Sequence, residues 1–158
     1  MYQKKKTIPA ILLFSALSIA ACHLAPHEHE AKSADVEYLL MPGMASLDLP
    51  FSSAVRVDRT LYLSGNIGIL PGTRDLAPGG IQGQTRQTLD NIKAVAEQFG
   101  SSMDKIVKCT VFLADIAEWG AMNEIYRTYF KNPPARSAIG ASGLALNARV
   151  EIECIATI

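Results

Sequence analysis

The chain has 158 residues, of which 49% are hydrophobic and 19% charged, which fits one globular domain with a real core and excludes a disordered chain. Fifteen basic and fifteen acidic residues give a formal net charge of zero, but Lys4, Lys5 and Lys6 precede the first acid, so the balance without them is 12 minus 15, or −3. A slightly acidic domain argues against nucleic acid as its main partner.

The N-terminal segment has the layout of an export signal. The three lysines and an apolar run over residues 8–21 predict a signal peptide over residues 1–21, and the run is too short to span a membrane. It ends in Ile-Ala-Ala-Cys at residues 19–22, which resembles a bacterial lipobox. The resemblance implies export to the periplasm and lipidation of Cys22, with this lipid anchor as the only membrane contact. An ordinary signal peptide with an incidental cysteine is the alternative.

Residues 22–36 are predicted to be a tether, and they contain His23, His27 and His29. Histidine tracts can bind metal, but no rigid scaffold sets ligand geometry here, so a solvated linker is the favoured interpretation. These are all the histidines of the chain. The domain predicted over residues 37–158 therefore lacks a Ser-His-Asp triad, a Cys-His pair and a histidine-built metal site. Its general base has to be a carboxylate, a lysine or a tyrosine.

The first half of the domain reads as strands followed by a helix. We expect a strand over residues 36–40 and a hairpin over residues 55–63. Glycine and proline between residues 71 and 83 predict a loop. A helix follows and ends near Gly100. Its apolar face consists of Leu89, Ile92, Val95, Ala96 and Phe99.

The second half begins with a strand over residues 106–113. The predicted inward side of this strand consists of Val107, Cys109, Val111 and Leu113. Asp115 and Glu118 resemble a capping box at the start of a second helix. The apolar stripe of that helix, which is more often core than cofactor contact, consists of Trp119, Met122, Ile125, Tyr126 and Tyr129. Two further strands complete a single α+β domain with its helices over one sheet face.

Two cysteines, Cys109 and Cys154, lie in apolar strand patterns. Buried, inert thiols are the default interpretation. An oxidising periplasm would permit a disulfide between them, but the sequence alone does not show that they are close.

An arginine and a glutamate stand out as candidate site residues. Pro133 and Pro134 end the second helix, so Arg136 opens an extended segment at a fixed place. A permanently charged fork on a rigid segment suits two-pronged capture of a carboxylate. Glu151 lies in an alternating strand and could activate a water. By pattern alone, a surface arginine paired with an acid and a charge on a solvated strand face are the alternatives.

Five segments in register resemble the RidA (YjgF) family of reactive intermediate deaminases. They are residues 63–66 (Leu-Ser-Gly-Asn), 84–93, 122–126, 134–137 (Pro-Ala-Arg-Ser) and 150–153 (Val-Glu-Ile-Glu). The resemblance covers most of the chain after about residue 37. It implies a chorismate-mutase-like fold, with a mixed sheet and two helices on one face, and a homotrimer with ligand clefts between subunits.

The resemblance also implies an activity. The expected reaction is hydrolysis of enamines and imines derived from amino acids, of the 2-iminopropanoate and 2-iminobutanoate type, to 2-keto acids and ammonia, without a metal or organic cofactor. Arg136 would hold the substrate carboxylate, and Glu151 would position the water and move protons. The substrate-binding positions implied besides Arg136 are Phe51, Ser64, Gly65 and Asn123.

Two departures from the family pattern leave a second function open. Phe51 stands where deaminase members usually have a tyrosine, and Ala138 stands where many have a cysteine. The known enamine substrates also arise in the cytoplasm, where an exported protein would not meet them. The alternative is a non-enzymatic relative that binds small carboxylic acids or acts like a chaperone. An endoribonuclease, claimed for some relatives, is disfavoured by the charge of −3 and the absence of histidine.

Overall fold

The structure is a computed structural model that describes residues 33–158. The predicted signal peptide, Cys22 and the tether up to residue 32 lie outside the described residues, so export and lipidation stay predictions. In the part of the chain that is described, no helix combines the length and the apolar character needed to cross a membrane.

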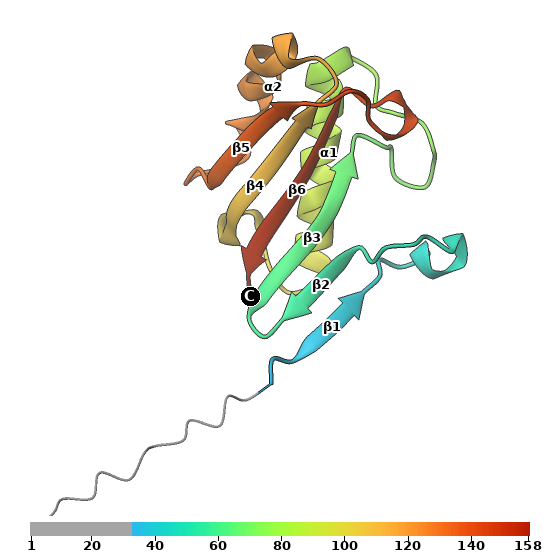
Figure 1. Ribbon diagram of the computed structural model, residues 1–158, viewed down its shortest axis with the longest axis vertical. Helices are drawn as coiled ribbons and strands as arrows, with labels where there is room; N and C mark the ends of the chain where they lie inside the picture. The colour runs from blue at the N-terminus through green and yellow to red at the C-terminus, as the bar shows by residue number, and fades with distance from the viewer. Residues whose placement is uncertain (1–32) are drawn as a thin grey trace, which may run out of the picture. The chain divides into compact units, whose positions relative to one another are not determined.

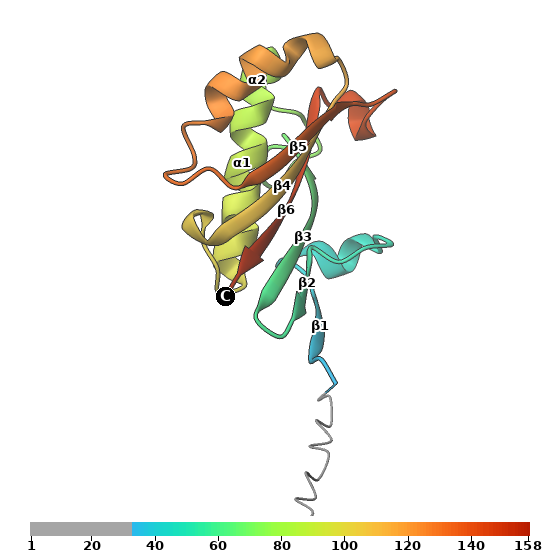
Figure 2. The same cartoon turned by 60° about the vertical axis from the view of Figure 1, so that its left-hand side comes forward.

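A six-stranded mixed sheet forms the body of the domain, in the order β1-β2-β3-β6-β4-β5. The strands are β1 (Val36–Leu39), β2 (Ala54–Val57), β3 (Thr60–Ile67), β4 (Ile106–Leu113), β5 (Ala135–Gly140) and β6 (Val150–Thr157). Only β4 and β5 run parallel to each other. Helices α1 (Gly80–Gln98) and α2 (Trp119–Tyr126) cover one face of the sheet, as the two views in Figures 1 and 2 show. This is the predicted α+β arrangement.

The core lies between the sheet and the two helices. The predicted apolar face of α1 is buried throughout, and Gly100 takes the left-handed conformation (φ +85°) just after the helix, as expected of a residue that ends a helix. The predicted hairpin forms between β2 and β3, with Asp58 in the left-handed conformation in its two-residue turn. Alternation and helical periodicity therefore place most elements correctly.

The predicted loop over residues 71–83 is too long, because α1 already begins at Gly80. The glycines that suggested a loop have another role. A Cβ at Gly83 would collide with the carbonyl oxygen of Pro78, so this glycine permits close packing inside the first turn of the helix. Gly79 caps the helix in the left-handed conformation.

The inward side of β4 differs from the prediction at its first residue. Ile106 is buried and Val107 is 48% exposed, the reverse of what simple alternation predicts. The register between β4 and β6 shifts between Ile106 and Lys108, and such a bulge inserts one residue and exchanges the two faces. From Cys109 onward the predicted inward residues are buried.

The predicted capping box forms only in part. The side chain of Asp115 accepts a hydrogen bond from the backbone N–H of Ala117 at 2.9 Å, so it caps the short 3₁₀ turn before α2. Glu118 does not reach back to Asp115. Its carboxylate instead forms an ion pair with Arg149, just before β6.

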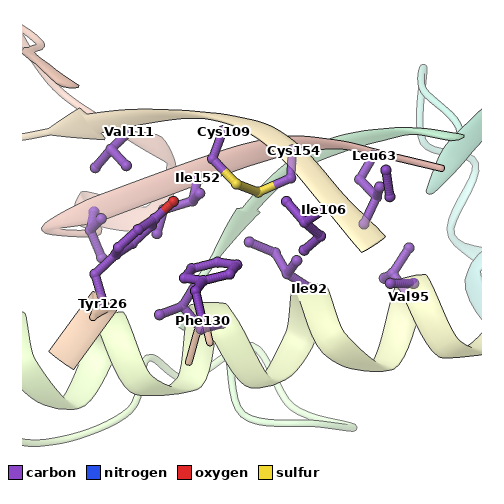
Figure 3. Packing of buried hydrophobic residues seen from close by; sticks show 14 of the residues in the cluster. Leu63, Ile92, Val95, Ile106, Cys109, Val111, Tyr126, Phe130, Ile152 and Cys154 are labelled. Carbon is purple, nitrogen blue, oxygen red and sulfur yellow. A yellow bond between two sulfur atoms is a disulfide. The ribbon is translucent and has the colours of Figure 1, made fainter. Parts of the chain in front are cut away.

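Cys109 and Cys154 form a disulfide, so the default interpretation of two inert thiols is wrong. They face each other directly across β4 and β6, with their Cα atoms 4.1 Å apart. Figure 3 shows the bond on the α1 side of the sheet, within the core. The 45 residues between the two cysteines conceal this proximity in the sequence, because pairing register cannot be read from alternation.

Reducing this disulfide is expected to lower the free energy of unfolding by about 2–4 kcal/mol, because the bond closes a long loop in the unfolded chain. Urea unfolding with and without a reducing agent measures the change. A Cys109→Ala/Cys154→Ala variant is the control and should be insensitive to the reducing agent. Equal stability of the oxidised and reduced wild type would contradict the expectation.

Candidate functional site

The predicted site residues fall into two groups on opposite faces of the sheet. Arg136 is the register partner of Cys109, whose side chain lies in the core, so Arg136 extends on the face that the helices cover. Glu151 is the register partner of Phe112, which lies between the buried residues Val111 and Leu113. Glu151 therefore extends on the opposite face. Strand β4 also separates the two strands, so a single copy of the chain does not bring the two side chains together.

The first group surrounds the partly buried guanidinium of Arg136 on β5. Its Nη1 donates a hydrogen bond to Oδ1 of Asn123 on α2 at 2.8 Å. Its Cζ lies 4.5 Å from the ring centroid of Tyr126 and 5.7 Å from that of Trp119. Among residues 33–158, no carboxylate forms an ion pair with Arg136, whereas Arg56 and Arg149 are both paired.

Arg136 borders an open pocket of about 420 Å³ at the β5 edge of the sheet. The pocket is lined by Asn123, Tyr126, Arg127, Phe130, Pro133, Pro134 and Arg136. Helix α2 already ends at Tyr126, so the prediction that Pro133 and Pro134 end this helix is wrong, and the two prolines instead form part of the pocket wall. This combination of a free cation with aromatic and proline walls suits a small organic carboxylate.

Tyr126 takes part in both the core and this group. It is 5% exposed and its ring packs against Phe130 at a centroid distance of 4.7 Å, between the strands and α1 (Figure 3). Burial raises the pKa of Tyr126 to about 12, although the nearby Arg136 acts in the opposite direction. The hydroxyl is therefore neutral at physiological pH, and it has no hydrogen-bond partner among the described residues.

The second group surrounds Glu151 on the sheet face opposite α1 and α2. A Cβ at Gly65 would collide with the carboxylate of Glu151 as it lies here, so the glycine permits this close approach, and its φ does not require a glycine. Ser64 and Gly65 form a bulge in β3, because they lie between the register pairs Leu63–Cys154 and Asn66–Ile152. Bulges of this kind often lie beside binding sites.

The loop that contains Phe51 is tied to this second group. The hydroxyl of Ser64 donates a hydrogen bond to the carbonyl oxygen of Ser52 at 2.6 Å. The backbone N–H of Ser64 donates another to the carbonyl oxygen of Ser53 at 3.2 Å. Phe51 directly precedes this anchor and is 52% exposed. Phe51, Ser64, Gly65 and Glu151 thus belong to one region, and Asn123 and Arg136 belong to the other.

Sequence reasoning assigned Trp119 and Tyr126 to the apolar stripe of the second helix and missed their contact with Arg136. The available signal was their spacing from Asn123. Residues 119, 123 and 126 follow each other at i, i+4 and i+7, which places them on one face of a helix. Only the crossover from β4 through α2 to the parallel strand β5 shows that this face meets Arg136.

No group of three His, Cys, Asp or Glu side chains within residues 33–158 is arranged to hold a metal ion.

Comparison with known proteins identifies the family. A model of the Endoribonuclease L-PSP family matches residues 45–158. A mouse 2-iminobutanoate/2-iminopropanoate deaminase is 44% identical over 108 residues, which are 68% of this chain and 80% of that protein. A Rid-family protein of unknown function from Yersinia pestis is 47% identical, with a TM-score of 0.66 over 69% of this chain and 88% of that one.

E. coli TdcF, solved with bound serine, is 32% identical, with a TM-score of 0.66 over 70% of this chain and 91% of that one. Sequence and fold thus agree over most of the described domain. Four of the five segments that resemble the family contain Ser64, Gly65, Asn123, Tyr126, Arg136 and Glu151. The chain therefore belongs to the RidA (Endoribonuclease L-PSP) family.

Proposed function

We propose that this protein is a hydrolytic deaminase that converts 2-imino acids and their enamine tautomers to 2-keto acids and ammonia. Its mammalian relatives are named 2-iminobutanoate/2-iminopropanoate deaminases. The observation that carries the proposal is Arg136, a partly buried guanidinium beside a pocket with no carboxylate paired to it among the described residues. A 2-imino acid supplies the missing carboxylate and needs only a water at the adjacent carbon.

The reaction needs little beyond orientation and proton transfer. The free N–H groups of Arg136 bind the substrate carboxylate and fix the imine carbon next to it. Glu151 accepts a proton from water as the water oxygen bonds to that carbon, and the proton then passes to the nitrogen. In the resulting carbinolamine, Glu151 accepts the hydroxyl proton and passes it to the amino nitrogen, the C–N bond breaks as the carbonyl of the keto acid forms, and ammonia leaves.

One complete site then requires two copies of the chain. Within one copy, Arg136 and Glu151 lie on opposite sheet faces, so Arg136 of one copy has to meet Glu151 of the partner subunit. This supports the homotrimer with clefts between subunits that the family resemblance implies. Light scattering should give three times the mass of one chain, and a monomer at micromolar concentration would remove the shared site.

The activity is tested with an imine made in situ. An amino-acid oxidase converts alanine or 2-aminobutanoate to the imine, and the protein is expected to accelerate the release of ammonia and keto acid. Heat-denatured protein is the control. No acceleration, despite binding of 2-oxobutanoate at Arg136, would favour the second candidate, a non-enzymatic binder of small carboxylic acids. The missing hydroxyl at Phe51 and the serine bound to TdcF favour that candidate over others.

We also propose that the protein is exported and anchored through a lipid on Cys22. The signal-like residues 1–21 and the lipobox-like residues 19–22 support this. The disulfide between Cys109 and Cys154 adds support, because disulfides persist mainly in oxidising compartments. The physiological imine would then have to arise outside the cytoplasm.

Mass spectrometry of the mature protein is expected to find a chain that begins at Cys22 and carries lipid there. A Cys22→Ala variant is the control and should remain unlipidated. An unmodified Cys22, in a mature chain that begins at another residue, would exclude the lipid anchor.

A further inference from the structure

Within residues 33–158, no acidic side chain pairs with the guanidinium of Arg136. Three side chains of α2 contact it: Asn123 accepts a hydrogen bond from Nη1 at 2.8 Å, and the rings of Tyr126 and Trp119 lie 4.5 and 5.7 Å from Cζ. A guanidinium has five N–H donors. Asn123 accepts from one of them, and the guanidinium donates no other hydrogen bond to a described residue.

We infer that Trp119 and Tyr126 are positioning residues that hold Arg136 through its contacts with their aromatic rings and thereby keep its N–H fork free for the substrate carboxylate. The inference rests on the proposed role of Arg136 in the deaminase. An aromatic ring attracts a cation through its quadrupole and needs no N–H donor to do so. A nearby Asp or Glu would also hold the arginine, but it would pair with the same fork that the substrate needs.

The ring of Tyr126, rather than its hydroxyl, carries this role. The hydroxyl is buried without a partner, and so it neither orients Arg136 by a hydrogen bond nor offers one to a ligand in the described structure. Trp119 is 43% exposed, although large aromatic side chains are usually well buried, and its contact with Arg136 accounts for its position at the first residue of α2.

Leucine substitutions test the inference, because they remove the ring and keep apolar bulk. In Trp119→Leu and Tyr126→Leu, the Kd for 2-oxobutanoate and the KM for the imine are expected to rise roughly 5- to 20-fold each. The kcat should stay within about twofold, because Arg136 binds the carboxylate equally in the ground and transition states. Tyr126→Phe and Trp119→Phe keep a ring and should restore most of the affinity.

Tyr129→Leu is the matched control, since it removes a tyrosine three residues further along whose hydroxyl bonds to Asp90 and not to Arg136. Its Kd and KM should equal those of the wild type. If both ring-deleting variants bind 2-oxobutanoate as the wild type does, or lose activity only in proportion to the folded fraction, the inference is wrong.

A second comparison separates positioning from packing. Asn123→Asp keeps the shape of the side chain but adds a charge that pairs with Arg136, so it should weaken 2-oxobutanoate binding roughly 10-fold more than Asn123→Ala does. If only packing mattered, the aspartate variant would be the milder one, and that result would overturn the inference.

Binding and turnover together distinguish the two claims. Imine hydrolysis by the wild type with unaltered affinity in both leucine variants rejects the inference alone. Keto-acid binding that weakens in these variants, in a wild type without imine hydrolysis, rejects the deaminase alone and supports the inference. A wild type that binds no keto acid at all rejects the role of Arg136 on which the inference rests.

Discussion

Replacing Arg136 by alanine is expected to lower kcat/KM for imine hydrolysis roughly 10²–10³-fold, which corresponds to about 3–4 kcal/mol of lost binding. The loss should appear mainly in KM and in the Kd for 2-oxobutanoate, because the guanidinium anchors the carboxylate before and during the reaction. Arg136→Lys should recover only a small part, since lysine offers a point charge without the planar fork. Isothermal calorimetry with 2-oxobutanoate and steady-state kinetics measure both quantities.

Arg59→Ala is the control for a general loss of positive charge. Arg59 lies in the turn between β2 and β3, where its Nη2 donates to the carbonyl oxygen of Ile158. This variant should bind 2-oxobutanoate like the wild type. Wild-type affinity in Arg136→Ala would show that the arginine is not the carboxylate anchor, and the functional proposal would lose its main support.

Replacing Glu151 by glutamine is expected to lower kcat roughly 10²–10⁴-fold and to leave the Kd for 2-oxobutanoate nearly unchanged. The amide has the shape of the carboxylate but cannot accept the proton of the attacking water. Glu151→Gln is therefore expected to change kcat and not Kd, whereas Arg136→Ala is expected to change mainly Kd and KM. Kinetics with the imine generated in situ separate the two patterns.

Glu153→Gln is the matched control. Glu153 extends from the same face of β6, two residues further along, and its substitution removes the same charge. It should turn over like the wild type. If Glu151→Gln also turns over at the wild-type rate, Glu151 is only a charge on the strand face and another group has to be the base.

The sequence predicted the elements well because their patterns are local. Alternation located the hairpin around Asp58, and helical periodicity located the buried face of α1. It failed where the outcome depends on contacts between distant segments. Gly83 looked like a loop residue, but its missing Cβ lets the helix pack against Pro78. Ile106 replaces Val107 in the core because of a bulge that forms only when β4 pairs with β6.

In the candidate site too, local features could be predicted from the sequence, and contacts between distant segments could not. The residue types pointed to a carboxylate anchor and a base, and the family resemblance supplied their roles. The separation of Arg136 and Glu151 onto opposite faces follows from two pairing registers, Cys109 with Arg136 and Phe112 with Glu151, and neither can be read from the sequence. The same registers bring Cys109 against Cys154 and so decide the disulfide.

The central claim is that one active site takes Arg136 from one copy of the chain and Glu151 from another. At imine concentrations well below KM, Arg136→Ala and Glu151→Gln proteins are each expected to be nearly inactive alone, also after dissociation and reassociation. When the two are dissociated, mixed in equal amounts and reassociated, about a quarter of the sites in a cyclic trimer should combine an intact Arg136 with an intact Glu151. Imine hydrolysis should then return to a comparable fraction of the wild-type rate. A mixed assembly that stays as inactive as its two parents would contradict the shared site.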